Sequence, residues 1–167
     1  FLVRNVFCSA DPGTRSRLSA GVSYTSQLAA GDLVTSFAVG RVLHSRHPDY
    51  ADGDWVVHAS GWTDYQLADG RGYLQKLDPA WTSAQGRELV PLSAWIGVLG
   101  IPGMTAWFGM HRVAGVQPGD RVLVSSAAGP VGATAGQVAR RMGAATVIGI
   151  AGGAQKCSWL RDEAGFD

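Results

Sequence analysis

The chain has 167 residues, 46% of them hydrophobic and six of them Trp, so it can bury a core and is not expected to be disordered. Its 14 basic and 13 acidic residues nearly cancel. No run of Lys or Arg forms the basic stripe that nucleic acid or an anionic membrane surface would require, so we expect neither partner.

The two cysteines, Cys8 and Cys157, are far apart in the sequence and form neither a disulfide framework nor a zinc-finger spacing. This usage favours a reducing, cytoplasmic location. No stretch of 18 or more apolar residues is present, so no transmembrane helix is predicted. None of the four histidines stands at ligand spacing from a cysteine or a carboxylate, so we predict no catalytic or structural zinc.

The first part of the chain, residues 1–94, is predicted to be mostly β. Short strand-like runs, VRNVF, FAVGRVLHS, WVVHAS, DYQLA and YLQKL, alternate with turn clusters such as ADPGTRS and HPDYADGD. Gly40 lies inside the second run and indicates a bulge or a close backbone approach. Short strands with frequent turns predict a small barrel or sandwich.

The second part, residues 95–167, has a different pattern. SAWIGVLG and MTAWFGMHRVAG are helical in pattern, with a break expected at IPG between them. RVLVSS and TVIGIA are continuous apolar runs, which predict strands buried on both faces of a parallel sheet. Each run precedes a predicted helix, and the helix between them places Val131, Ala135, Val138 and Met142 on one face.

The stretch SSAAGPVG joins the first apolar run to its helix, and nearly all of its residues are small. Ala127, Gly129 and Gly132 have the spacing of the dinucleotide fingerprint, with Ala in the first Gly position. Gly129 would let the backbone approach a pyrophosphate, and Gly132 would let the helix pack against the strand. The helix start, where Pro130 costs little, would offer N–H groups to phosphates. The alternative is a tight strand-to-helix turn that binds nothing.

The end of the second run indicates which cofactor the site would take. An NAD site needs an acidic residue about 20 residues after the last glycine. That position is Gly152, its neighbours are uncharged, and Lys156 follows. A cation beside an uncharged turn suits a 2′-phosphate, so we predict NADP(H). The alternative for Lys156 is a solvated side chain at a helix start, a position that the helix dipole makes unfavourable for a cation.

Several stretches together resemble one family, the zinc-independent medium-chain dehydrogenases/reductases, and within it the NADPH-dependent double-bond reductases. These stretches are DPGTRSRLS, FAVGRVLHSRHPDYADGD, GWTDYQLADG, LGIPGMTAWFG, SSAAGPVG and AGGAQKC. The resemblance covers essentially the whole chain. Its most specific element is LGIPGMTAWFG followed by SSAAGPVG at this distance.

The resemblance implies an α/β chain with a β-rich part: a GroES-like catalytic domain at residues 1–94, then the first half of a Rossmann doubly wound parallel sheet at residues 95–167. It implies hydride transfer from NADPH to the β-carbon of an α,β-unsaturated ketone or aldehyde, without a metal. It also places Thr105 at the cofactor, near the nicotinamide. The cofactor-binding candidates are then Thr105, Ala127, Ala128, Gly129, Pro130, Val131, Gly132, Gly152 and Lys156.

One position departs from the family. Tyr and Met usually follow the Asp-Pro pair and face the active site, whereas Gly13 and Thr14 follow it here. Gly13 has no side chain that could donate a hydrogen bond, so the pocket is reshaped or the polarising group comes from elsewhere. The catalytic residues therefore stay unassigned. A quinone reductase of the same superfamily and a non-catalytic NADPH-binding protein remain as alternatives.

Family members are much longer than this chain, so we expect a fragment that lacks its N-terminus and the second half of the Rossmann domain. Such a fragment would leave apolar surface uncovered and be inactive alone, because hydride transfer needs donor and acceptor carbons held close. The predicted activity thus belongs to the complete protein. The family is commonly dimeric through the Rossmann sheet, so a homodimer is expected for the full-length protein.

Overall fold

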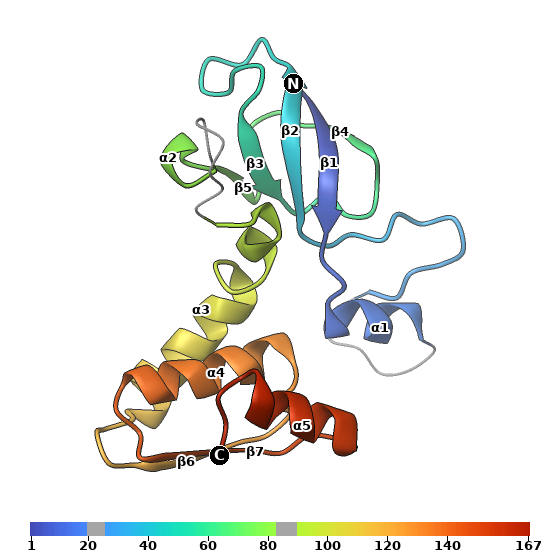
Figure 1. Cartoon of the computed structure of the whole chain (residues 1–167). Coiled ribbons are helices and arrows are strands. Elements are labelled where there is room, and N and C mark those ends of the chain that lie inside the picture. Colours follow the sequence, from blue (N-terminus) through green and yellow to red (C-terminus); the bar gives the residue numbers. More distant parts are fainter. Residues whose placement is uncertain (20–25, 83–89) are drawn as a thin grey trace. The chain divides into compact units, whose positions relative to one another are not determined.

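The computed structural model describes residues 1–19, 26–82 and 90–167. These residues form two compact units, Phe1–Ile96 and Gly97–Asp167. Figure 1 shows the first unit as a strand-rich body and the second as a helix-rich one, and each is described by itself below.

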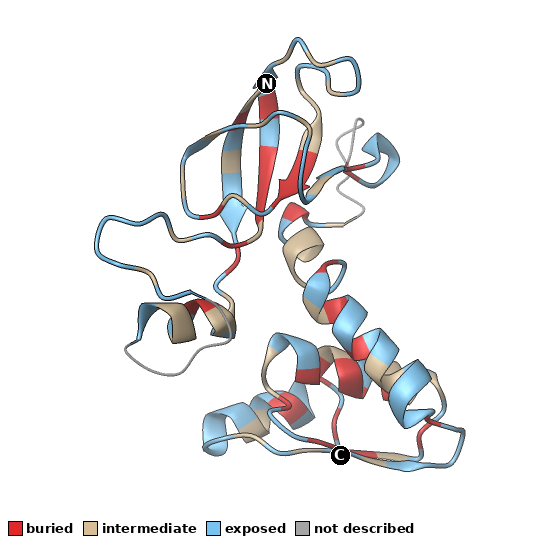
Figure 2. Ribbon diagram, turned by 180° about the vertical axis from the view of Figure 1, so that it is seen from behind, coloured by how far each residue is buried: buried red, intermediate tan, exposed pale blue. Residues whose placement is uncertain are grey.

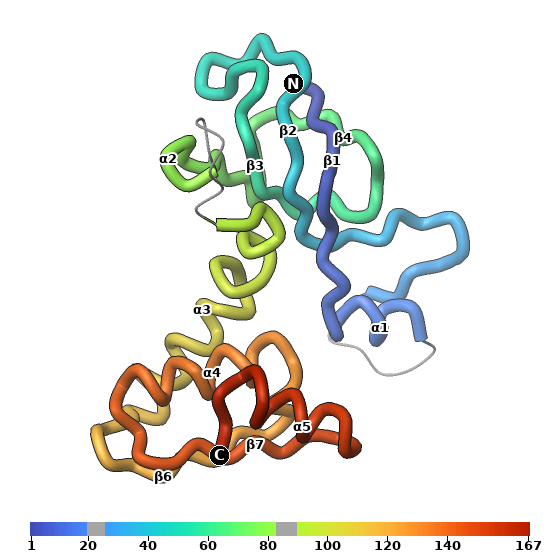
Figure 3. The backbone as a smooth tube through the Cα atoms, in the orientation of Figure 1, coloured from blue at the N-terminus to red at the C-terminus, as the bar shows by residue number. Residues whose placement is uncertain are grey.

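The first unit contains one antiparallel sheet of five short strands, whose path Figure 3 traces. The strands are β1 (Leu2–Cys8), β2 (Ala38–His44), β3 (Trp55–His58), β4 (Tyr65–Leu67) and β5 (Leu74–Lys76). Their order across the sheet is β4-β1-β2-β3-β5. Each of the five strand-like runs in the sequence overlaps one of these strands.

The sheet of the first unit is packed on both faces, and Figure 2 marks the buried parts of its strands. Val56 joins Val3 and Val42 in one buried cluster. The next residue, Val57, points to the other face and belongs to a second cluster. Gly40 makes the predicted close approach, since a Cβ atom at that position would overlap Cγ1 of Val3.

The described residues of the first unit also form three short helices. They are α1 (Pro12–Leu18), α2 (Pro79–Thr82) and the 3₁₀ helix η1 (Leu92–Ile96). The prediction of a simple turn at ADPGTRS is wrong, because Asp11 caps a helix there and Pro12 occupies its first turn. Asp followed by Pro is favoured both in turns and at helix N-termini, so the pair alone could not decide between them.

The second unit is built as helix, strand, helix, strand, helix. Its elements are α3 (Ile101–Phe108), the π-helical continuation η2 (Gly109–Ala114), β6 (Arg121–Val124), α4 (Pro130–Arg141), β7 (Thr146–Gly149) and α5 (Ala154–Asp162). Strands β6 and β7 pair in parallel, with Val122 opposite Val147. The predicted strand–turn–helix–strand unit is therefore present.

The break expected at IPG is present but lies just before it, at residues 97–100, between η1 and α3. Helix α3 begins at Ile101 and takes Pro102 into its first turn, where a missing N–H costs nothing. Gly103 is inside the helix for a packing reason, since a Cβ atom there would collide with the carbonyl group of Val98. The helix ends as predicted at Gly115, whose φ of 60° is in the left-handed region.

The two strands of the second unit are buried on one face only, which corrects the expectation of burial on both. Figure 1 shows α4 and α5 over the same side of β6 and β7. Val124 and Val147 face these helices and are 7% and 0% exposed, whereas Leu123 and Ile148 are 66% and 49% exposed. Leu123 and Ile148 are direct neighbours in the register, so they form one exposed apolar face.

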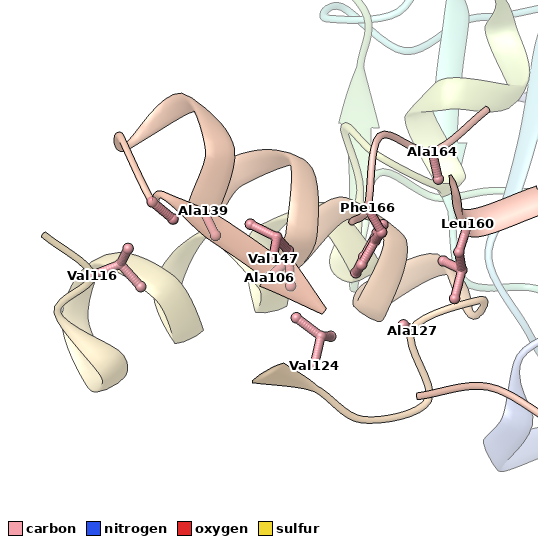
Figure 4. Packing of buried hydrophobic residues seen from close by; sticks show 11 residues of the cluster. Ala106, Val116, Val124, Ala127, Ala139, Val147, Leu160, Ala164 and Phe166 are labelled. Atoms are coloured by element: carbon pink, nitrogen blue, oxygen red, sulfur yellow. The ribbon is translucent and has the colours of Figure 1, made fainter. Parts of the chain in front are cut away.

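Helix α4 packs mainly through small residues, and the predicted apolar face is confirmed in part, since Ala135 lies in the core and Met142 packs against it. Val131 is exposed, whereas Gly132, Ala135, Gly136 and Ala139 are buried. A Cβ atom on Gly136 would overlap the ring of Phe166. Figure 4 shows Phe166 beside Leu160 in this core, with Ala127 and Val124 nearby.

Candidate functional site

The turn between β6 and α4 is held firmly by backbone hydrogen bonds. The N–H of Ala127 donates to the carbonyl of Ile150 at 2.9 Å, and the N–H of Ile150 donates to the carbonyl of Val124 at 2.8 Å. These bonds extend the parallel ladder beyond the two strands. The N–H of Gly129 donates to the carbonyl of Ser126 at 3.0 Å, which closes the turn.

Gly132 lies where the helix meets this turn. A Cβ atom at Gly132 would be 2.5 Å from the carbonyl oxygen of Ser126 and 2.7 Å from Cα of Ala127. Both distances are shorter than any real contact of this kind. Only glycine therefore allows α4 to start so close to the end of β6, which is the packing role that the glycine spacing predicts.

The first turn of α4 presents free backbone donors. Gly129 is the N-cap residue and no side chain caps the helix. The N–H of Ala133 donates to the carbonyl of Gly129 at 2.9 Å. Within the described part of the chain, no acceptor pairs with the N–H of Val131 or of Gly132. Two donors and the positive end of the helix dipole are thus available to an anion.

A hollow of about 260 Å³ lies beside this turn and reaches the turn after β7. Its lining residues are Ser126, Ala128, Gly129, Ala151, Gly152 and Lys156. Lys156 lies in the first turn of α5 and is exposed, and its ammonium group forms no ion pair with any described residue. Gly152 leaves space around it, since a Cβ atom there would contact nothing within 4 Å.

The hollow brings together four of the residues predicted for cofactor binding, Ala128, Gly129, Gly152 and Lys156. Ala127 is instead fully buried beneath the turn. The others are in helices: Pro130, Val131 and Gly132 form the first turn of α4, and exposed Thr105 lies on α3.

The hydroxyl of Thr105 is already engaged, since it donates to the carbonyl of Ile101 at 2.8 Å. Two lining residues, Ser126 and Ala151, were not among the sequence candidates. Their position directly beside the fingerprint and beside Gly152 is the signal that could have found them.

In the first unit, the Asp-Pro-Gly segment is fixed by hydrogen bonds. The hydroxyl of Ser9 donates to a carboxylate oxygen of Asp11 at 2.7 Å and accepts from the N–H of Phe37 at 3.1 Å. The indole N–H of Trp62 donates to the carbonyl of Ser9 at 2.9 Å. Gly13 follows within α1 and offers no side chain. The segment is therefore ordered although its expected polar side chain is missing.

The described residues contain no group of three or more His, Cys, Asp or Glu side chains arranged to hold a metal ion. No helix within the described ranges is long and apolar enough to cross a membrane. Cys8 and Cys157 are both free thiols.

Known proteins with similar sequences are reductases. Residues 1–76 match the family model described as the N-terminal domain of oxidoreductase. The chain is 38% identical over 170 residues to the NADPH-dependent curcumin reductase of Escherichia coli, covering 99% of this chain and 45% of that protein. It is 37% identical over 167 residues to the NADP(+)-dependent 2-alkenal reductase of Nicotiana tabacum, covering 99% of this chain and 46% of that protein.

A solved structure with the same fold is CurA of Vibrio vulnificus in complex with NADPH. It superposes with a TM-score of 0.81 at 35% identity, covering 99% of this chain and 46% of that one. The predicted fold class, a GroES-like β domain followed by part of a Rossmann sheet, is confirmed by this likeness. The chain is therefore similar, over nearly its whole length, to reductases named as NADPH-dependent or NADP(+)-dependent. It spans about half the length of the relatives it matches.

Proposed function

We propose that the complete protein is an NADPH-dependent reductase that saturates the C=C bond of α,β-unsaturated ketones and aldehydes. The observation that carries this proposal is the hollow that Lys156 shares with the two glycine turns after β6 and β7. The relatives support it, since one is named for curcumin and another for 2-alkenals as substrate.

The residues present fit an NADP(H) molecule. The free N–H groups of Val131 and Gly132 would bind the pyrophosphate, which approaches the backbone at Gly129. The ammonium of Lys156 would bind the 2′-phosphate, and no carboxylate lines the hollow to repel it. We further propose that Thr105 contacts the cofactor toward its nicotinamide end.

The chemistry that the bound nicotinamide supplies is a hydride. The chain contributes by fixing the cofactor so that the hydride carbon and the β-carbon of the substrate can meet at a short distance. Hydride addition breaks the C=C π bond, the electron pair moves to the carbonyl oxygen, and a proton then adds to the α-carbon. Gly13 cannot hydrogen-bond that oxygen through a side chain, so either the pocket is reshaped or the donor comes from another residue.

The same proposal implies a division of the chain into two domains. Residues 1–94 would be the GroES-like catalytic part and residues 95–167 the NADP-binding part. We also propose a homodimer for the full-length protein. The location proposed is the cytoplasm, where the free thiols of Cys8 and Cys157 stay reduced.

The test follows the absorbance of NADPH, and separately of NADH, in the presence of the complete protein and a panel of enals, enones and quinones. Fast loss of NADPH with enones and enals, and slow loss with NADH, is the expected result. Turnover confined to quinones would replace this proposal by a quinone reductase. Tight NADPH binding without turnover of any acceptor would make the protein a non-catalytic binder, in which Gly13 reflects a lost active site.

A further inference from the structure

We propose that the hydroxyl group of Ser126 binds the same phosphate group as Lys156 and thereby helps to select NADPH over NADH. This inference rests on the proposed function, because it concerns the cofactor expected in the same hollow. It adds a specificity-determining residue that the glycine spacing does not indicate.

The first argument is the composition of the hollow. Of its six lining residues, Ser126 carries the only hydroxyl group and Lys156 the only charge. Both side chains are exposed, and the Ser126 hydroxyl forms no hydrogen bond with another described residue. A phosphate oxygen accepts several hydrogen bonds at once, so a hydroxyl and an ammonium that face one small hollow can serve the same group.

The second argument is the fixed backbone of Ser126. Its φ is +49°, the one positive value among the non-glycine residues that the structure describes. This conformation is uncommon for serine. The carbonyl of Ser126 accepts the N–H of Gly129, and the next residue is tied to Ile150. The turn therefore holds Ser126 in one orientation beside the hollow, which limits the entropy that its hydroxyl would lose on binding a phosphate.

The test measures NADPH and NADH affinity of the complete protein by isothermal titration calorimetry, with Ser126→Ala as the main variant. Loss of a hydrogen bond to a charged group should weaken NADPH binding about tenfold, while NADH affinity stays unchanged. Ser125→Ala is the matched control, since Ser125 is equally exposed but does not line the hollow. It should bind both cofactors as the unaltered chain does.

Two further variants separate the hydroxyl from the backbone. Ser126→Gly relieves the φ of +49° and also lacks the hydroxyl, so it should lose NADPH affinity as Ser126→Ala does. In the Lys156→Ala background, Ser126→Ala should cost much less than it does alone, because both groups act on one phosphate.

Several outcomes would overturn the inference. If Ser126→Ala loses equal affinity for NADPH and NADH, the hydroxyl contacts a part that both cofactors share. If it loses no affinity, the hydroxyl does not bind the cofactor. Full NADPH affinity in Ser126→Gly would mean that the backbone alone matters. These results presuppose that the complete protein binds NADPH more tightly than NADH. If the complete protein binds neither, the proposed function fails as well.

Discussion

Lys156 is the residue on which the proposed choice of NADPH over NADH depends. A cation in the first turn of α5 is opposed by the helix dipole, and none of the described carboxylates compensates it with an ion pair. An anion in the adjacent hollow would supply that compensation. The position of this lysine therefore makes sense as part of a phosphate site.

Replacing Lys156 by Ala should weaken NADPH binding by at least about tenfold, the value of one strong charge-assisted contact. NADH binding should change little, because NADH lacks the 2′-phosphate. Fluorescence titration of both nucleotides measures this. Arg161→Ala is the control, since Arg161 lies in the last turn of the same helix and outside this hollow. If Lys156→Ala loses equal affinity for both nucleotides, the lysine does not bind the 2′-phosphate.

His58 is a buried titratable residue in the first unit, only 3% exposed. Its Nε2 is 2.7 Å from Oδ1 of Asn5, and its Nδ1 accepts the N–H of Ser60 at 3.2 Å. Because the ring accepts at Nδ1, the neutral ring donates from Nε2. Burial lowers the pKa of His58 below its usual value. Protonation would add a buried charge and break the bond from Ser60.

The stability of the first unit should therefore depend on pH. Above about pH 6.5 His58 is neutral in both the folded and the unfolded chain. Below that value the unfolded chain takes up a proton first, so stability falls as the pH drops toward the lowered folded pKa. One proton limits the slope to about 1.4 kcal/mol per pH unit. Urea unfolding at several pH values between 7.5 and 5 measures it, and His58→Gln should show a shallower slope. An unchanged slope in this variant would contradict the assignment.

The glycine turn between β6 and α4 requires a close approach of helix α4. Its buried face is made of Gly132, Ala135, Gly136 and Ala139, which lets it approach both the turn and Phe166 closely. The helix can pack this closely because the glycine and alanine residues on its buried face have at most a methyl group as side chain. This explains why the larger Val131, which is exposed, does not mark its inner face.

Gly132→Val should abolish the affinity for both NADPH and NADH. The first side-chain atom would already be 2.5 Å from the Ser126 carbonyl, so the helix start must move away from the turn. Strain of this kind also costs about 1–3 kcal/mol of stability. Thermal unfolding and nucleotide titration check both effects. Gly109→Ala, at a helical glycine with open space around it, should remain as stable or gain up to about 1 kcal/mol. Unchanged nucleotide affinity in Gly132→Val would reduce the turn to a structural element.

The elements that the sequence predicted well are those with a local cause. The five strand-like runs and the strand–turn–helix–strand unit follow from residue pattern and turn chemistry. The start of α3 was missed because Pro102 and Gly103 suit a break as well as a helix start, and the close approach of Gly103 to Val98 is visible only in the structure. Ser126 was missed because its role depends on a backbone angle and on a hollow shared with a helix that begins many residues later.

At the scale of the whole molecule, the sequence predicted uncovered apolar surface but did not place it on one face of β6 and β7. Periodicity shows that RVLVSS and TVIGIA are apolar, but it does not show how many layers of structure surround them. In this chain only one layer of helices covers the two strands. Leu123 and Ile148 therefore contribute little to its stability, whereas Val147 on the opposite face is part of the core.

Leu123→Thr and Ile148→Thr should each change the free energy of unfolding of this chain by no more than about 0.5 kcal/mol, as for exposed positions in general. They should also reduce the binding of a hydrophobic dye, because they remove exposed apolar area. Val147→Thr is the matched control and should destabilise by about 1–3 kcal/mol, since it buries a hydroxyl without a partner. Urea unfolding compares the three variants. Equal losses would mean that both faces are buried.

The central claim is that a hydride from NADPH reaches the β-carbon of an enone, and isotope labelling tests it directly. The complete protein would be supplied with NADPH deuterated at both C4 positions of the nicotinamide and with an α,β-unsaturated ketone. The predicted product is the saturated ketone with one deuterium on its β-carbon, seen by NMR. An allylic alcohol with deuterium on the former carbonyl carbon, or no deuterated product at all, would contradict the account.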